Sequence, residues 1–495
     1  MKLKHSLLAL GAAAALGVAG SAHAATFFGY YADTSASNKA TGLEVRDGGS
    51  GDMLVVPYFN AQGKTQTALH ITNQDSVGKV VRVHVRGAAN GDILKSFTVL
   101  LGAHDTWTFT IDPVAGAAPQ LNSAHPACVF TDTNGATGKL GEPLSLDNLA
   151  PYISAAAKIQ HAGEGYIEII NMAEVVSGST MDAINKRNCG ALNALVRDFE
   201  PSKEADVKAT GLVPTFGGLS GIWYLINQDT WTAYSGRMTA IRASDGAGKG
   251  RLAQIRFFPQ RTTAEVLEGG TDGEKLTLAF MSLGSAERPF TATMDTGGWS
   301  ALPDLSMPIS DAFAMPQEQI TAIGKAVNLK KDIVNDFASL PTGAVPMFTD
   351  WIMSNPLQRY YAGVDYGKSA AEAKVVKSDY GSGVTLYGAD GSTMENTDIG
   401  PVVCQKAELS IRDRAGTVKQ EKNLEPCGAV WTLGFASQSP VAASVGRIVL
   451  TPPAAAGWAN LEYDGDPVAL GFAAFSAKNK DTGISYPTTW PHARY

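Results

Sequence analysis

Four cysteines are the residues whose type and spacing most directly imply chemistry. Cys128, Cys189, Cys404 and Cys427 are the only cysteines in a chain of 495 residues. An even number suits disulfides, and no CxxC spacing accompanies them as a zinc site would require. Proximity in sequence favours Cys128 with Cys189 and Cys404 with Cys427, although four cysteines allow three pairings. Disulfides would place the protein in an oxidising compartment.

Three acidic, glycine-rich segments are the next candidates, because carboxylate and carbonyl oxygens are the ligands that calcium prefers. The segments read DGGSGD, DTNG and DGD, and their candidate ligands are Asp47, Asp52, Asp132, Asn134, Asp464 and Asp466. None of them completes an EF-hand, and ordinary turn chemistry accounts for all three. Calcium is therefore the one cofactor that these residues suggest.

Residues suited to hydrolysis form no complete catalytic motif. Ser220 lies in GGLSG, whose spacing differs from the nucleophile elbow GxSxG and which precedes an expected strand. Glu164, Glu168 and Glu174 lie in or around another expected strand, where Glu168 could be a buried general acid, but no second carboxylate is fixed opposite it. The remaining histidines are scattered singly and are expected at the surface or in turns: His70, His84, His104, His125, His161 and His492.

The first 24 residues have the organisation of a secretory signal peptide. Lys2, Lys4 and His5 precede an apolar run from Leu7 to Val18, and Ala22-His23-Ala24 supplies the small residues of a cleavage site. The apolar run is too short for a permanent membrane span, and no later stretch is long enough. We therefore expect export to the cell surface or the medium, with the periplasm as an alternative, and no integral membrane span.

Composition narrows the expected partners. The formal net charge is −7, whereas nucleic acid and anionic lipid attract clustered Lys and Arg. Self-association or binding to cell-envelope components fits better, and nucleic acid is excluded as a main partner.

Alternation of apolar and polar residues predicts a mainly β protein. Between Met53 and Ile111, Val81, Val83 and Val85 face one way while Arg82 and His84 face the other. We expect two or more immunoglobulin-like β-sandwich domains with a few inserted helices. The expected divisions are a signal peptide over 1–24, an N-terminal sandwich over 25–120, a β-rich middle region with loop and helical insertions over 121–350, and a C-terminal sandwich over 351–495.

Two segments interrupt the predicted strands. Residues 113–149 are rich in Gly, Pro, Asn and Thr and are expected to form a long loop. Residues 316–340 have apolar side chains at roughly helical spacing between two prolines, which predicts a helix.

Short stretches spread over the chain resemble a group of secreted proteobacterial cell-surface proteins of the surface-layer-like kind. The stretches are 51–59, 68–73, 101–109, 165–171, 349–351 with 359–361, and 457–458 leading to 471–472. The group carries no activity to transfer, so the resemblance implies a location and a structural or adhesive role. The expected function is a non-enzymatic, exported structural protein of a surface layer or matrix. The alternative is a secreted carbohydrate-binding protein or glycoside hydrolase, whose Trp and Glu side chains would line a groove.

Overall fold

The computed structural model describes residues 28–30, most of 42–197, 209–244, short strands between 255 and 293, and most of 332–494. The expected signal peptide lies outside these residues. The described chain is mainly β, as the alternation predicts. No helix in the described ranges has both the length and the apolar character needed to cross a membrane.

The N-terminal unit consists of two antiparallel sheets. Sheet 1 has the strand order β2-β15-β3-β11-β5-β6-β9, with β12 paired to β11, and sheet 2 has the order β10-β8-β7-β4-β13-β14. The strands of sheet 1 are β2 (Gly42–Asp47), β3 (Met53–Asn60), β5 (Gly78–Gly87), β6 (Ile93–Leu101), β9 (Cys128–Thr131), β11 (Glu164–Val175), β12 (Leu212–Val213) and β15 (Thr239–Ser244). Those of sheet 2 are β4 (Thr65–Asn73), β7 (Thr106–Asp112), β8 (Gln120–Ser123), β10 (Leu140–Pro143), β13 (Leu219–Asn227) and β14 (Thr232–Arg237).

The two sheets pack face to face through large apolar side chains. Phe97 on β6 contacts Trp107 and Phe109 on β7 edge-on, with ring centroids 5.8 and 5.9 Å apart. Sheet 2 keeps the predicted alternation of buried and half-buried residues, as β4 shows. In sheet 1, β3, β5 and β11 are buried along their whole length. Both faces of the central strands in sheet 1 are therefore covered.

Short helices cover part of the second face of sheet 1. Helices α3 (Gly178–Asn185) and α4 (Asn193–Arg197) flank the 3₁₀ helix η1 (Cys189–Leu192), and their apolar residues join a second core with Val80, Leu100 and Met172. Helix α2 (Ala155–Ala162) precedes β11 and is capped by the Ser154 hydroxyl, which accepts a hydrogen bond from the Ala157 amide at 3.1 Å.

The C-terminal unit also consists of two sheets. Sheet 3 has the order β26-β25-β29-β19-β32 and sheet 4 the order β28-β27-β20-β30-β31, in which only β27 and β28 are parallel. Sheet 3 contains β19 (Asp332–Ala338), β25 (Ala407–Asp413), β26 (Val418–Leu424), β29 (Ala456–Tyr463) and β32 (Ala493–Arg494). Sheet 4 contains β20 (Met347–Ser354), β27 (Val430–Gly434), β28 (Arg447–Val449), β30 (Leu470–Lys478) and β31 (Ser485–Pro491).

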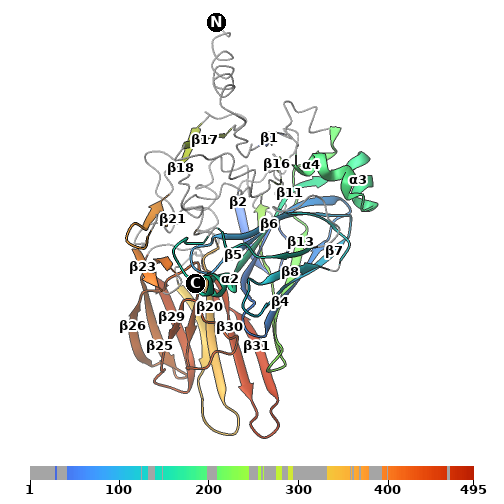
Figure 1. Cartoon of the computed structure of the whole chain (residues 1–495). Coiled ribbons are helices and arrows are strands. Elements are labelled where there is room, and N and C mark those ends of the chain that lie inside the picture. Colours follow the sequence, from blue (N-terminus) through green and yellow to red (C-terminus); the bar gives the residue numbers. More distant parts are fainter. Residues whose placement is uncertain are drawn as a thin grey trace.

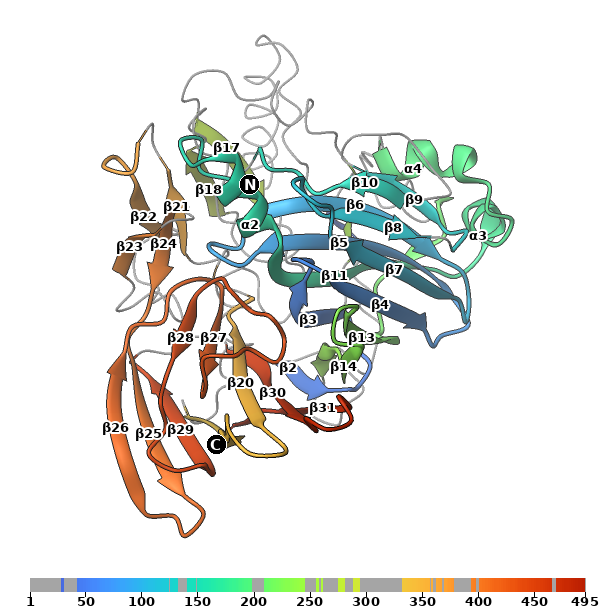
Figure 2. The same cartoon turned by 60° about the horizontal axis from the view of Figure 1, so that its bottom comes forward.

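The central strands of sheet 4, β20, β27 and β30, are buried on both faces and join the two units. Trp351 and Ala473 belong to the core that it shares with sheet 3, whereas Ile352, Phe472 and Ala474 belong to the core of the N-terminal unit. Trp223 on β13 packs on Phe472 with ring centroids 4.6 Å apart. Figures 1 and 2 show β20, β30 and β31 lying between the outer sheet of the C-terminal unit and the strands of the N-terminal unit. Sheet 4 therefore contributes side chains to both hydrophobic cores and connects the two units.

The remaining strands form two-stranded sheets. They pair β1 (Phe28–Tyr30) with β16 (Ile255–Phe257), β17 (Lys275–Phe280) with β18 (Arg288–Thr293), β21 (Ala362–Asp365) with β22 (Lys374–Lys377), and β23 (Thr393–Thr397) with β24 (Gly400–Cys404).

Strand pairing crosses the divisions expected at residues 120 and 350. Strands β11, β13, β14 and β15 come from the expected middle region but complete sheets 1 and 2, and β19 completes sheet 3. The expected loop over 113–149 contains β8, β9 and β10. The helix expected over 316–340 is wrong at its end, where residues 332–338 form a strand paired with β29; residues 316–331 lie outside the described part. Cross-strand pairing outweighs the helical spacing there.

Candidate functional site

The structure contains two disulfides with the pairing that sequence proximity favours. Cys128 on β9 is bonded to Cys189 of η1, and Cys404 on β24 is bonded to Cys427 just before β27. The first attaches the helical segment to sheet 1, and the second links β24 to the start of a sheet 4 strand. Both are compatible with the oxidising environment met by exported proteins. Glu395 lies near Cys404 and Cys427, but their sulfurs are bonded to each other and are not free as metal ligands.

Removing the first disulfide is expected to destabilise the protein more than removing the second. The sequence separations are 61 and 23 residues, so loss of loop-closure entropy predicts about 4 kcal/mol for C128A/C189A and about 3 kcal/mol for C404A/C427A. Urea unfolding of the two double variants measures both values. Each double variant is the control for the other, because both lose two cysteines and one disulfide. A larger effect for C404A/C427A would contradict the entropic account.

Glu164, one of the three carboxylates noted in the sequence, is buried between the two units. Its carboxylate accepts hydrogen bonds from the Tyr58 hydroxyl at 2.6 Å, the Ser444 hydroxyl at 2.6 Å, and the Ser444 and Val445 amides at 2.9 and 3.1 Å. Burial raises the pKa of Glu164 above its ordinary value, and these hydrogen bonds oppose that rise. The donors come from both units, so this carboxylate holds the interface together.

Glu168 and Glu174 are also committed to contacts inside the protein. Glu168 accepts from Arg86 Nε at 2.7 Å with both side chains fully buried. Glu174 accepts from Lys79 Nζ at 2.9 Å, and burial raises the pKa of Glu174. None of the three candidate carboxylates reaches a surface where substrate could meet it. Ser220 likewise lies on β13, where its hydroxyl accepts from Gln74 at 3.0 Å.

The described calcium candidates, Asp47, Asp52 and Asp464, lie in different parts of the fold. Asp52 is buried and accepts from the Thr215 hydroxyl at 2.6 Å and the Ala243 amide at 2.9 Å, so it fastens β15 and the segment before β13 to β3. Asp47 ends β2. Asp464 is exposed at the end of β29. Asp132, Asn134 and Asp466 lie outside the described residues.

Three histidines are buried, contrary to the expected surface or turn positions: His84, His161 and His492. His161 at the end of α2 is 1% exposed, and neither ring nitrogen has a hydrogen-bond partner among the described residues. Burial lowers the pKa of His161 to about 4. Its Nε2 lies 3.9 Å from Asp92 Oδ2, and at neutral pH this is a contact with an uncharged ring.

His161 is expected to make stability fall as pH decreases from about 6.5 to about 4. The unfolded chain takes up a proton near the ordinary pKa of 6.5 while the folded ring stays neutral down to about 4, which corresponds to about 3 kcal/mol. The free-energy difference between wild type and His161→Phe, measured by urea unfolding across this range, should follow that curve. His104→Phe, in the turn before β7, is the control, and a pH-independent difference would contradict the assignment.

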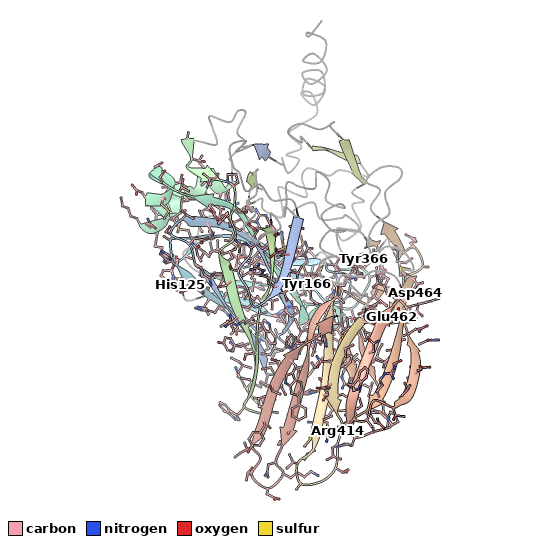
Figure 3. All side chains as sticks on the ribbon, turned by 180° about the vertical axis from the view of Figure 1, so that it is seen from behind. His125, Tyr166, Tyr366, Arg414, Glu462 and Asp464 are labelled. Atoms are coloured by element: carbon pink, nitrogen blue, oxygen red, sulfur yellow. A yellow bond between two sulfur atoms is a disulfide. The ribbon has the colours of Figure 1, made fainter. Side chains whose placement is uncertain are left out.

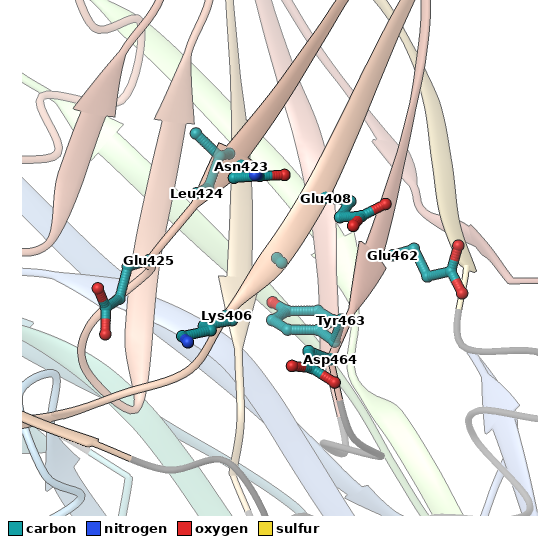
Figure 4. Close-up of a pocket in the computed structure, with 9 residues that line it drawn as sticks. Lys406, Glu408, Asn423, Leu424, Glu425, Glu462, Tyr463 and Asp464 are labelled. Atoms are coloured by element: carbon teal, nitrogen blue, oxygen red, sulfur yellow. The ribbon is translucent and has the colours of Figure 1, made fainter.

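An acidic pocket of about 600 Å³ lies on the outer surface of sheet 3. Figure 4 shows Glu408 on β25 and Glu462 on β29 side by side, and the two residues are direct cross-strand partners. Lys406, Glu425 and Asp464 complete its charged lining. The Asp464 amide donates to the Lys406 carbonyl at 2.8 Å, which fixes the two strand ends together.

The pocket is suited to attracting cations rather than to catalysis. Asp332 also stands opposite Glu462, so three carboxylates form a row across β19, β29 and β25. Like charges in direct opposition weaken a sheet, and a bound cation would relieve that repulsion. Among the described residues, however, no three carboxylates of this pocket bring their oxygens within 4.8 Å of one another, so the row offers surface charge and not a closed ion site. The Tyr463 hydroxyl is engaged elsewhere, since it accepts from the Trp431 indole at 3.0 Å in the core.

A second pocket, of about 350 Å³ and here called the aromatic pocket, lies at the other end of sheet 3, and four of its nine lining residues are aromatic. Figure 3 shows Arg414, which lines it, at the far end of the strands from Glu462 and Asp464. The sequence does not distinguish the two tryptophans of this pocket, Trp458 and Trp490, from tryptophans of the hydrophobic cores. Only burial separates them from Trp107, Trp223, Trp351 and Trp431, which are at most 3% exposed.

Sequence analysis also misses Asp350 on β20. It is buried, accepts from Arg447 at 3.0 Å and from the Ser439 hydroxyl, and burial raises its pKa to about 6. Its partners lie about 90 residues away in sequence, so no local pattern could have indicated them.

Comparison with known proteins adds no relative. The chain matches no family model, no curated protein and no solved structure.

Proposed function

We propose that this protein is a non-enzymatic structural component of the cell surface, exported and built from immunoglobulin-like β-sandwich domains that pack laterally in a surface layer or matrix. The observation that carries the proposal is sheet 4, whose central strands contribute one face to the core of each unit and so join the two units. A protein whose two units are packed together in this way is suited to bearing load at fixed geometry.

The positions of the candidate carboxylates support the same proposal. Glu164, Glu168 and Glu174 all accept hydrogen bonds or form ion pairs inside the protein. Two disulfides add covalent links suited to an oxidising environment outside the cytoplasm. The resemblance to secreted surface proteins agrees with this reading.

We also propose that calcium ions bridge neighbouring molecules in such a layer. The row of Asp332, Glu462 and Glu408 presents three carboxylates on an outer surface, where a divalent cation could bridge neighbouring molecules. In this proposal calcium acts between copies of the chain rather than in a reaction.

Cell fractionation combined with electron microscopy tests the structural role. Envelopes from wild-type and deletion strains should differ by an ordered lattice, and a chelator should disperse that lattice if calcium bridges its subunits. The variant E408Q/E462Q should weaken a calcium-dependent lattice, whereas E44Q, which changes a half-buried carboxylate on β2, should leave it intact. Protein found free in the periplasm or the medium, with no lattice, would contradict the structural role and favour the secreted carbohydrate binder.

A further inference from the structure

The aromatic pocket has the composition of a ligand site. Trp458 on β29, Phe475 on β30 and Trp490 on β31 contribute rings, and Asp336 and Arg414 contribute charged groups beside them. Pockets of about 300–1,000 Å³ that combine apolar walls with a few polar groups are typical of small-ligand sites. Its volume of about 350 Å³ is at the small end of that range, which suits one ring-sized group.

The aromatic side chains are held in place by their neighbours. Trp458 stands directly between Asp336 on β19 and Arg412 on β25 in the strand register. The Arg412 guanidinium carbon lies 5.1 Å from the centre of the Trp458 ring, a cation–π contact that orients the indole. Trp490 packs on Phe475 with ring centroids 5.5 Å apart. The pocket therefore presents preorganised rings rather than mobile ones.

The backbone at Arg414 is ordered by its turn. The Asp413 carboxylate accepts hydrogen bonds from the Ala415 amide at 3.0 Å and the Thr417 amide at 2.9 Å. These bonds order the turn between β25 and β26, where Arg414 is exposed.

Exposure of Trp490 distinguishes this place from the cores. Trp490 is 40% exposed and Trp458 is half-buried, although an exposed aromatic ring gives up much of the free energy that its burial would supply. A ligand that covers these rings would recover it.

The charges of the pocket favour a neutral, hydroxyl-rich ligand. Arg414 can only donate hydrogen bonds, and the carboxylate of Asp336 can only accept them. Arg412, which packs on Trp458, adds a second positive charge, and the Asp413 carboxylate in the adjacent turn adds a second negative one. The four charges cancel, so the site lacks the excess positive charge that a phosphate or nucleotide would require. A pyranose ring meets both demands, because its C–H face packs on an aromatic ring while its hydroxyls both donate and accept.

We propose that this pocket binds one pyranose residue of a cell-envelope polysaccharide through Trp458 and Trp490, with Arg414 and Asp336 bonded to its hydroxyls. The site gives the protein a means of attachment at the surface. It does not require that the protein forms a layer, so its test is independent of the lattice experiment.

Ligand-observed NMR on the full mature chain tests the proposal, with the methyl glycosides of glucose, galactose, mannose, rhamnose and N-acetylglucosamine as probes. At least one should bind, and Trp458→Ala and Trp490→Ala should each weaken that binding by about tenfold or more. Trp458→Phe should keep part of the affinity, which separates loss of stacking from loss of folding.

Two control variants define the specificity of the effect. Trp231→Ala removes a 90% exposed tryptophan between β13 and β14, and Glu462→Gln changes the acidic pocket; both should bind the sugar as wild type does. Absence of binding by all five glycosides, binding unaffected by the Trp458 and Trp490 variants, or displacement of the sugar by inorganic phosphate would overturn the proposal.

Discussion

Glu164→Ala is expected to lower the free energy of unfolding by about 4 kcal/mol and to loosen the contact between the two units. The Tyr58 hydroxyl and the amides of Ser444 and Val445 donate to this carboxylate from opposite sides of the interface. Each buried donor left without an acceptor costs about 1–3 kcal/mol. Urea unfolding measures the loss, and calorimetry should show one transition in wild type that broadens or splits in the variant.

Ser444→Ala is the matched control, because it removes only one hydroxyl donor and keeps the carboxylate. Its expected cost is about 1 kcal/mol. The double variant E164A/S444A should cost less than the sum of the single changes, since the two residues contact each other directly. Strict additivity, or an unchanged single transition in Glu164→Ala, would show that Glu164 does not connect the units.

Arg86→Met is expected to lower the free energy of unfolding by about 3–5 kcal/mol. Arg86 and Glu168 form an ion pair of 2.7 Å between β5 and β11 with both side chains fully buried. Removing one partner leaves a charge in the core without its counter-ion, and this is far costlier than the net value of the pair. Chemical denaturation at neutral pH measures the effect.

Replacing both partners should restore much of the loss. R86M/E168L exchanges the pair for apolar side chains, and such exchanges are often neutral or stabilising. Arg46→Ala provides the surface comparison, because Arg46 pairs with Glu44 at 2.6 Å with side chains 45% and 31% exposed; its expected cost is below about 1 kcal/mol. Equal effects of Arg86→Met and Arg46→Ala would refute the dependence on burial.

Local patterns predicted strands better than they predicted which strands meet. Val81, Val83 and Val85 alternate as expected, but Arg82 and His84 on the other face are buried too, because elements distant in sequence cover that face. Residues 332–338 were misassigned for the same reason, since pairing with β29, more than 100 residues later, sets their conformation. The alternation of apolar and polar residues along a strand indicates which side of the sheet each residue faces. It does not indicate which element packs against that side.

The candidate sites show the same limit. The cysteine pairing is the one that sequence proximity favours among the three that four cysteines allow. The aromatic pocket brings together Asp336, Arg414 and Trp490 from three separate strands or turns, and no spacing rule connects them. The role of Glu164 was equally inaccessible, since its donor Ser444 is 280 residues away.

The packing of β30 against the N-terminal unit has a consequence for the order in which the protein can fold. Strands β30 and β31 follow almost every other described element in the chain, yet Phe472 on β30 covers Trp223 of the N-terminal unit. Until those strands are synthesised, the N-terminal unit has an open apolar end. A nascent or truncated chain would therefore expose apolar surface that is prone to aggregation. Addition of the last strands covers this surface.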